Sequence, residues 1–309
     1  MNSLERATPS LAVVGCGQMG SGIALTALRS GHDVAVFDQD PAAMRRCIAR
    51  VDEAAKHAPS SEGQIDAGAA VDRGTLLPAS SLEELGSRDI IIEAVREDLA
   101  TKKEIFAQLD RLCPEHTILA SNTSALSITE MSRATDRPDR FGGLHFHIPV
   151  TLIKTVEVIP GDETSPETVT ALCALAEAMG NEVVLAKDTP GFVTNRLLVP
   201  FILDAIRLVE QGTASRDAVD TSMHMACRHP MGPLLLADYI GLDTLRSMAI
   251  TMHQGLGEER FRPPQLLEGL VAQGHLGVKQ GRGFYNYRDP QDEGDHRASI
   301  VQRFTEVLR

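Results

Sequence analysis

The sequence predicts an α/β protein in which a doubly wound sheet, residues 1–188, precedes an all-helical domain, residues 189–309. Three observations support this prediction. Before Asp188, short apolar runs of strand length alternate with segments of helical spacing, which is typical of parallel β-α-β units. A glycine-rich turn joins the first of these strands to the first helix. After Asp188, apolar residues recur at helical spacing and no strand-like alternation remains.

The first domain is expected to begin with a buried strand over Leu11–Val14 and a helix over Gln18–Arg29, with Gly31 at a common helix-ending position. A second helix is expected to open at Pro41, because proline is favoured in the first helical turn. The further strands expected are 33–37, 89–94, 117–120, 140–147, 155–159 and 182–186, and the further helices are 102–112, 125–132 and 167–180. This alternation predicts parallel β-α-β units.

The second domain is expected to begin near Thr189 with a long helix, because DTPGFVTNRLLVPFILDAIRLVEQG has apolar residues at helical spacing. Pro200 lies inside this stretch and is expected to kink or interrupt the helix, since it removes a backbone donor. Asp188–Gly191 is the predicted hinge between the two domains.

Composition argues against several classes of protein. The 309 residues carry a net charge of −12 and 4% aromatic residues, which disfavours a nucleic-acid surface. The start lacks the pattern of a signal peptide, and no apolar run is long enough to span a bilayer. An odd number of cysteines without a CxxC pair favours free thiols in a reducing, cytoplasmic setting. We therefore expect a soluble cytoplasmic protein. The cysteines are Cys16, Cys47, Cys113, Cys173 and Cys227.

The turn VVGCGQMG has the spacing G-x-G-x-x-G between the first strand and the first helix. Gly15 permits a tight turn, Gly17 lets the backbone approach a pyrophosphate at the helix N-terminus, and Gly20 allows close helix–strand packing. Asp38 ends the next strand and suits a ribose 2′-hydroxyl; no arginine follows directly, which favours NAD over NADP. The alternative is a structural turn without a ligand. The residues predicted to bind the cofactor here are Gly15, Gly17, Gln18, Met19, Gly20 and Asp38.

Two histidines lie two residues apart in the apolar run GLHFHIP, and an acid lies in the later run TVEVI. Residues i and i+2 of a strand share a face, so His145 and His147 can converge. A buried Glu157 needs a partner, and a His145–Glu157 pair would suit a general base. Zinc held by all three residues is a rival interpretation, and histidines packed in a core are another. Hydride transfer is the more economical account beside a dinucleotide motif, so no metal is expected.

Two polar residues are left open by the sequence. Ser124 ends the loop SNTS after an apolar strand, where parallel sheets bind ligands. From the residues alone the favoured interpretation is an ordinary helix cap, with Ser124 or Thr123 capping the next helix and Glu130 too far along for a capping box. Asn195 lies on the long helix after the hinge, and its side chain could face a ligand or solvent.

Taken together, these motifs resemble the L-3-hydroxyacyl-CoA dehydrogenase family (3-hydroxybutyryl-CoA dehydrogenase-like) over nearly the whole chain. The matching segments are VVGCGQMGSGIA, IIEAVRED, SNTSALSIT, RFGGLHF, DTPGFVTNRLLVPF, HPMGPL, DYIGLDT and LGVKQGRGFYNY. The resemblance implies a Rossmann-like NAD-binding domain and a helical C-terminal domain that usually forms a homodimer interface. It also implies an active site in the cleft between the domains.

The resemblance implies roles for single residues. His145 matches the family's catalytic histidine, and Glu157 matches its acidic partner. Ser124 matches the serine that contacts substrate and cofactor, and Asn195 matches the asparagine that helps to bind the reacting group. The positions implied to contact the dinucleotide are Glu97, Lys102 and Lys279.

The reaction implied is reversible oxidation of a 3-hydroxyacyl thioester to the 3-oxoacyl thioester in fatty acid metabolism, with short chains such as 3-hydroxybutyryl-CoA. Two departures from the family leave alternatives open. Where the family usually has Phe-Phe-Asn-Pro, this chain has FHIP at Phe146–Pro149. Ile148 replaces the asparagine, and its side chain can neither donate nor accept the hydrogen bond that an asparagine makes to the nicotinamide side of the site. The segment after Asp40 is also less basic than in many members. The nearest alternative is an acyl-carrier-protein thioester or another short 3-hydroxy acid as substrate, in polyketide or other specialised biosynthesis. The others are an NAD-binding protein without catalysis and zinc hydrolysis.

Overall fold

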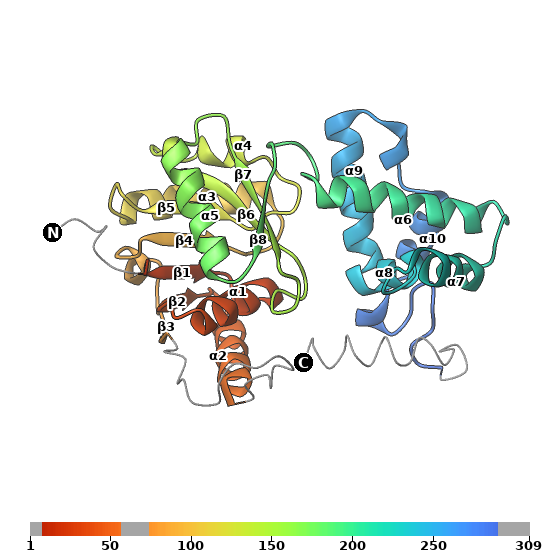
Figure 1. Cartoon of the computed structure of the whole chain (residues 1–309), viewed down its shortest axis with the longest axis horizontal. Coiled ribbons are helices and arrows are strands. Elements are labelled where there is room, and N and C mark those ends of the chain that lie inside the picture. Colours follow the sequence, from red (N-terminus) through yellow and green to blue (C-terminus); the bar gives the residue numbers. More distant parts are fainter. Residues whose placement is uncertain (1–7, 57–73, 290–309) are drawn as a thin grey trace. The chain divides into compact units, whose positions relative to one another are not determined.

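The computed structural model describes residues 8–56 and 74–289, which form two compact units on either side of the Thr189–Pro190 bond (Figure 1). The sequence-based division after Asp188 lies one residue before this bond. None of the described helices combines the length and apolarity that a bilayer crossing requires.

The described part of the first unit is built on one eight-stranded sheet with the order β3-β2-β1-β4-β5-β6-β7-β8 (Figure 1). The order reverses between β1 and β4, and open α/β sheets bind ligands at the carboxyl ends of strands at such a point. The strands are β1 (Leu11–Val14), β2 (Val34–Phe37), β3 (Leu76–Pro78), β4 (Ile90–Glu93), β5 (Ile118–Ser121), β6 (Phe141–Phe146), β7 (Thr155–Pro160) and β8 (Glu182–Leu185).

Helices pack on both faces of this sheet, which confirms the predicted doubly wound architecture (Figure 1). One face carries an apolar core that includes Ile23 of α1, Leu144 of β6 and Leu172 of α5. On the opposite face, the rings of Phe106 in α3 and Phe141 in β6 lie 4.6 Å apart. The helices of this unit are α1 (Gln18–Arg29), α2 (Pro41–Lys56), α3 (Leu99–Leu112), α4 (Ile128–Ser132) and α5 (Pro166–Ala178).

Three features of the first unit differ from the sequence-based expectation. β7 runs antiparallel to β6, because a short loop rather than a crossover helix joins the two strands. β3 was missed: it has three residues, one of them proline, and shows no apolar alternation. The helix expected from residue 125 begins only at Ile128, because the Ser127 hydroxyl oxygen accepts the Glu130 N–H and caps it there.

The second unit is helical where it is described, and its helices enclose one apolar core that includes Ile202, Leu234 and Phe261. α6 runs through Pro200 without the interruption that the sequence suggested. In the described residues after α10, the β-type pairing consists of isolated bridges around Arg282. The helices are α6 (Thr194–Glu210), α7 (Arg216–Cys227), α8 (Pro233–Ile240), α9 (Leu242–Leu256) and α10 (Gln265–Ala272).

Candidate active site

The glycine turn after β1 has the geometry expected of a dinucleotide loop. Gly15 has a φ of 102°, and a Cβ there would lie 2.7 Å from the backbone of Ala94. A Cβ at Gly20 would overlap the Gly15 carbonyl, so α1 can approach β1 only with glycine there. A Cβ at Gly17 would meet nothing within 4 Å, which leaves open space over the loop.

Hydrogen-bonding groups beside this open space fit an NAD ligand. Gly17 is the N-cap of α1 and provides no capping side chain, so the first helical N–H groups are suited to a pyrophosphate. Asp38 directly follows β2, and its carboxylate accepts the Cys16 N–H at 2.7 Å and the Asp40 N–H at 2.8 Å. Asp38 is thus held at the loop, where a carboxylate can accept a ribose hydroxyl.

Glu97 and Ser124 lie together at the carboxyl edge of the sheet. Glu97 Oε1 accepts the Thr123 hydroxyl at 2.6 Å, the Ser124 N–H at 2.8 Å and the Ser124 hydroxyl at 3.2 Å. Burial alone would raise the pKa of Glu97, but the charge of Lys102 and these hydrogen bonds outweigh it and lower the pKa. Glu97 is therefore an anion that orients the SNTS loop.

Lys102 is buried between two carboxylates. Its Nζ lies 2.7 Å from Glu93 Oε1 and 3.4 Å from Glu97 Oε2, and its side chain is 1% exposed. The other Glu93 oxygen accepts the Ser121 hydroxyl at 2.7 Å. The ion pair therefore joins α3 to the carboxyl ends of β4 and β5, and Lys102 links it to Glu97.

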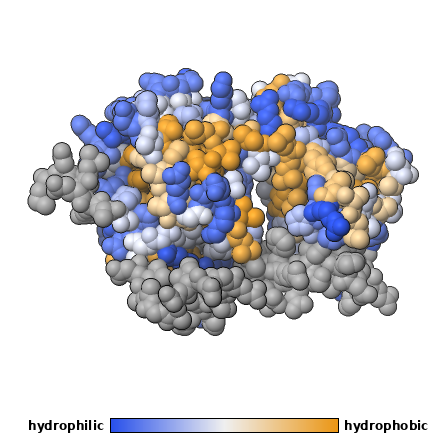
Figure 2. Space-filling view, viewed as in Figure 1, coloured by the Kyte–Doolittle hydropathy of each residue, from blue (hydrophilic) through white to orange (hydrophobic). Residues whose placement is uncertain are grey.

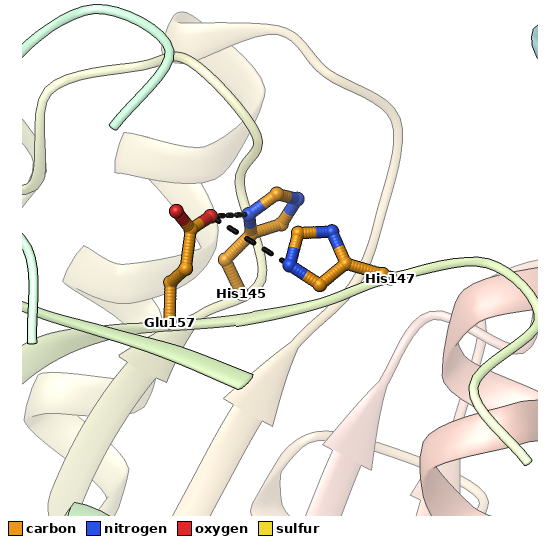
Figure 3. A group of neighbouring side chains, drawn as sticks. All are labelled: His145, His147 and Glu157. Carbon is orange, nitrogen blue, oxygen red and sulfur yellow. Dashed lines mark hydrogen bonds and ion pairs between the residues drawn. The ribbon is translucent and has the colours of Figure 1, made fainter. Parts of the chain in front are cut away.

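His145 and Glu157 form the pair that the sequence suggested (Figure 3). They lie opposite each other in the β6–β7 register, and His145 Nδ1 is 2.7 Å from Glu157 Oε2. Both are buried. Because an ionised carboxylate can only accept, Nδ1 carries the proton of the neutral imidazole and Nε2 keeps a lone pair. This is the tautomer that a general base requires.

His147 approaches the same carboxylate without bonding to it. The two imidazole rings are 4.5 Å apart in an edge-to-face arrangement, and His147 Nε2 is 3.8 Å from Glu157 Oε2 (Figure 3). That separation is too long for a hydrogen bond, and Nε2 is buried without a hydrogen-bond partner. Burial and the nearby His145 lower the pKa of His147 to about 4, although Glu157 opposes this. His147 is therefore neutral at physiological pH.

One donor atom from each of His145, His147 and Glu157 lies within 4.8 Å of the other two. The three residues that the sequence suggested as zinc ligands therefore lie close together. Ile148, the other departure from the family pattern, is 52% exposed.

The two remaining predicted residues lie in the second unit. Asn195 is buried in the first turn of α6. Lys279 Nζ lies 2.5 Å from Asp243 Oδ1, and both side chains are partly exposed. The other predicted catalytic and cofactor residues therefore lie in the first unit, and these two lie in the second.

Sequence reasoning missed residues that support the site. Glu93 ends the buried strand IIIE, and an acid at the carboxyl end of an apolar strand could have marked it. Asp188 was expected only as a hinge residue. Its carboxylate accepts the Ser127 hydroxyl at 2.8 Å and the N–H groups of Ile128 and Thr129 at 3.0 and 2.8 Å. Ser127, and not Ser124 or Thr123 as the sequence favoured, therefore caps α4.

Family comparisons match both units. A model described as "3-hydroxyacyl-CoA dehydrogenase, NAD binding domain" matches residues 10–189, and the model of the corresponding C-terminal domain matches residues 191–287. The chain is thus a two-domain, NAD-dependent oxidoreductase. It belongs to the 3-hydroxyacyl-CoA dehydrogenase family.

Individual relatives cover nearly the whole chain. A probable 3-hydroxybutyryl-CoA dehydrogenase of Bacillus subtilis is 46% identical over 281 residues, 90% of this chain and 96% of that protein. The mitochondrial hydroxyacyl-coenzyme A dehydrogenase of Rattus norvegicus is 41% identical over 283 residues, 89% of this chain and 90% of that protein. The crystal structure of (S)-3-hydroxybutyryl-CoA dehydrogenase from Ralstonia eutropha has a TM-score of 0.84 at 38% identity, covering 90% of this chain and 99% of that one.

These relatives are named for CoA thioesters, so the carrier-protein alternative gains no support. Family membership also makes the chain an enzyme of 3-hydroxyacyl thioesters, in place of an NAD-binding protein without catalysis or a zinc hydrolase.

Proposed function

We propose that the chain interconverts short-chain 3-hydroxyacyl-CoA and 3-oxoacyl-CoA, with 3-hydroxybutyryl-CoA as the substrate of oxidation. The observation that carries the proposal is the buried His145–Glu157 pair, with Nδ1 and Oε2 2.7 Å apart, in the unit that binds NAD. The 46% identity to a relative named for 3-hydroxybutyryl-CoA supports the short chain.

In this proposal His145 Nε2 takes the proton of the substrate hydroxyl. Glu157 keeps Nδ1 protonated and stabilises the imidazolium that forms. NAD, when bound, supplies the acceptor for the hydride that leaves C3. Ser124 and Asn195 are proposed to hold the hydroxyl and thioester oxygens, where charge changes during the reaction.

The proposed cofactor residues fall into two sets. The loop residues Gly15 to Gly20, with Asp38, would hold the pyrophosphate and the ribose. The second set consists of Glu97, Lys102 and Lys279. The burial of Lys102 supports an indirect role, in which its ammonium fixes the Glu97 carboxylate instead of reaching the dinucleotide itself.

A substrate screen tests this function. NADH oxidation would be followed at 340 nm with 3-oxoacyl-CoA esters of increasing length and with acetoacetyl-carrier protein. We expect the highest kcat/KM for acetoacetyl-CoA and at least about tenfold less for the carrier-bound ester, since the relatives are named for CoA esters. A preference for the carrier-bound or a long-chain ester would contradict the proposal.

We also propose that the chain is a homodimer through its C-terminal domain. An apolar groove on α6, α7 and α8 supports this, with Phe201, Leu208 and Val219 among its lining residues. Figure 2 shows hydrophobic surface on both units in the view drawn. Sedimentation velocity on Leu208→Glu should give monomers, whereas Leu185→Glu, exposed on the first unit, should leave dimers. A monomeric wild-type chain would contradict the proposal.

The proposed location is the cytoplasm. All five cysteines are free thiols in the structure, which suits a reducing compartment.

A further inference from the structure

A buried polar atom without a partner lies beside the proposed base. His147 Nε2 faces the oxygen of Glu157 that His145 already uses, at a distance too long for a hydrogen bond (Figure 3). An unsatisfied buried nitrogen is unfavourable, and either water or a ligand can satisfy it. The proton transfer proposed above uses His145 and Glu157, and it gives His147 no part.

Two imidazole nitrogens and one carboxylate oxygen converge at this point. Nδ1 of His145 and Nε2 of His147 both face Glu157, and one donor atom of each residue lies within 4.8 Å of the others. Two histidines and one glutamate form a common ligand set for Zn²⁺, with a fourth position left for water. We propose that these three residues bind a divalent transition-metal cation of the Zn²⁺ type, and that the bound cation inhibits the dehydrogenase.

Two of the three distances between donor atoms need little change to accept the cation; the third, between the two histidine nitrogens, is at most 4.8 Å and closes as the His147 side chain turns toward Glu157. A tetrahedral ion with ligands at about 2.0–2.2 Å requires donor atoms about 3.3 Å apart. The 2.7 Å distance from His145 Nδ1 to Glu157 Oε2 would widen, and the 3.8 Å distance from His147 Nε2 would shorten, each by roughly half an ångström. His145 and Glu157 sit on paired strands, so their backbones are already fixed for this.

Inhibition follows from which nitrogen the cation occupies. Coordination at Nδ1 of His145 moves the single proton of the neutral ring to Nε2. Nε2 then has no lone pair for the substrate hydroxyl proton. The glutamate oxygen that stabilised the imidazolium is coordinated as well. The cation therefore blocks the base without entering the dinucleotide loop.

Direct binding is the first test. The full-length protein, freed of metal with a chelator, would be titrated with Co²⁺, whose visible absorption reports tetrahedral coordination, and then with Zn²⁺. We expect one site per chain, at least about tenfold weaker in His147→Phe and His147→Asn. His116→Phe is the matched control, because His116 is an exposed histidine of the same unit and lies 3.9 Å from a carboxylate oxygen of Asp89. Absent binding, or unchanged affinity in both His147 variants, would overturn the site.

Inhibition is the second test, and it rests on the proposed function. NADH oxidation with acetoacetyl-CoA would be measured against Zn²⁺, each variant relative to its own metal-free rate. Wild type should be half-inhibited near the measured dissociation constant and restored by EDTA; both His147 variants should need at least about tenfold more Zn²⁺. Equal sensitivity would place inhibition elsewhere, for instance at the exposed Cys227 thiol, and overturn the proposal. If the metal-free enzyme does not turn over, the proposed function fails, whereas Co²⁺ binding still decides the site.

Discussion

Both units of the molecule bury carboxylates, but they stabilise them in different ways. In the first unit, Glu93 is paired with the Lys102 ammonium and Glu157 with the His145 imidazole. In the second, Asp220 accepts two backbone N–H groups of α8 and the Tyr285 hydroxyl. Asp238 similarly accepts two backbone N–H groups of the 284–285 segment and the Tyr287 hydroxyl.

The two ways of stabilising a buried carboxylate have different consequences for pKa and for chemistry. Burial raises the pKa of Asp238 to about 6 and also raises that of Asp220, because neutral donors compensate a charge incompletely. These aspartates join α7, α8 and the 284–287 segment, and no proton acceptor accompanies them in the hydrogen bonds described. Glu157, in contrast, holds a base in one tautomer. In this chain the buried carboxylate that marks the proposed chemistry is the one whose partner is an imidazole with a second nitrogen able to accept a proton.

The largest expected effect is the loss of the base. His145→Gln keeps a polar side chain toward Glu157 but cannot take a proton, so kcat should fall by about 10²–10⁴-fold. NADH binding, followed by cofactor fluorescence, should be unchanged because the glycine loop is intact. His116→Gln removes an exposed histidine of the same unit and should leave kcat unaltered. Turnover retained in His145→Gln would remove His145 from the role of base.

Next in size is the removal of a buried cation. Lys102→Met removes the cation shared by the Glu93 and Glu97 carboxylates, and the free energy of unfolding should fall by about 3–5 kcal/mol. Lys103→Met is the matched control, since Lys103 is partly exposed and pairs with Glu130 on the surface. Its effect should stay within about 1 kcal/mol. Urea unfolding monitored by circular dichroism compares the two, and equal losses would mean that the buried pair adds no stability.

A smaller loss is expected when a carboxylate of the second unit is removed. Asp220→Ala leaves the Leu234 and Leu235 N–H groups and the Tyr285 hydroxyl without an acceptor, at a cost of about 1–3 kcal/mol. Asp204→Ala, at an exposed position of α6, should change stability by less than about 1 kcal/mol.

Tyrosine fluorescence isolates this second effect. The chain has no tryptophan, and its tyrosines are Tyr239, Tyr285 and Tyr287, all in the second unit. Urea unfolding of Asp220→Ala followed by this signal should shift, while kcat per folded molecule stays at the wild-type value. A lost kcat in a folded Asp220→Ala would erase the distinction between the two units.

The sequence revealed local features of this comparison and missed tertiary ones. The glycine loop and the His145–Glu157 pair were predictable, because each depends on a short motif or on an acid placed in an apolar strand. The Lys102–Glu93 pair was not, since it depends on how α3 packs against β4. Ser127 was overlooked as a cap although Ser127-x-x-Glu130 has the local capping-box spacing; only its bond to Asp188, 61 residues away, lay beyond a local pattern. Contacts between distant segments are fixed by packing, which no local pattern encodes.

The smallest expected effect is a pH dependence of opposite sign in the two units. The pKa of His147 is lowered to about 4, from 6.5 for a free imidazole, mainly by burial. Between these values the unfolded chain binds a proton that the folded unit does not, so this group makes stability fall as the pH is lowered. The pKa of Asp238 is raised to about 6 from 3.8, so the folded state binds the extra proton and stability rises as the pH is lowered.

Single variants separate these contributions. Between pH 7 and pH 5 each group should change the free energy of unfolding by roughly 1–2 kcal/mol. His147→Phe should therefore lose less stability than wild type over this interval, when hydrogen exchange is measured on peptides of the first unit. Asp238→Asn should lose more stability than wild type over the same interval, when tyrosine fluorescence follows unfolding of the second unit. If His147→Phe and wild type had the same pH slope, His147 would titrate as an ordinary imidazole. The claim that His147 is neutral and lacks a hydrogen-bond partner beside the base would then be wrong. The claim that burial raises the pKa of Asp238 would be unaffected.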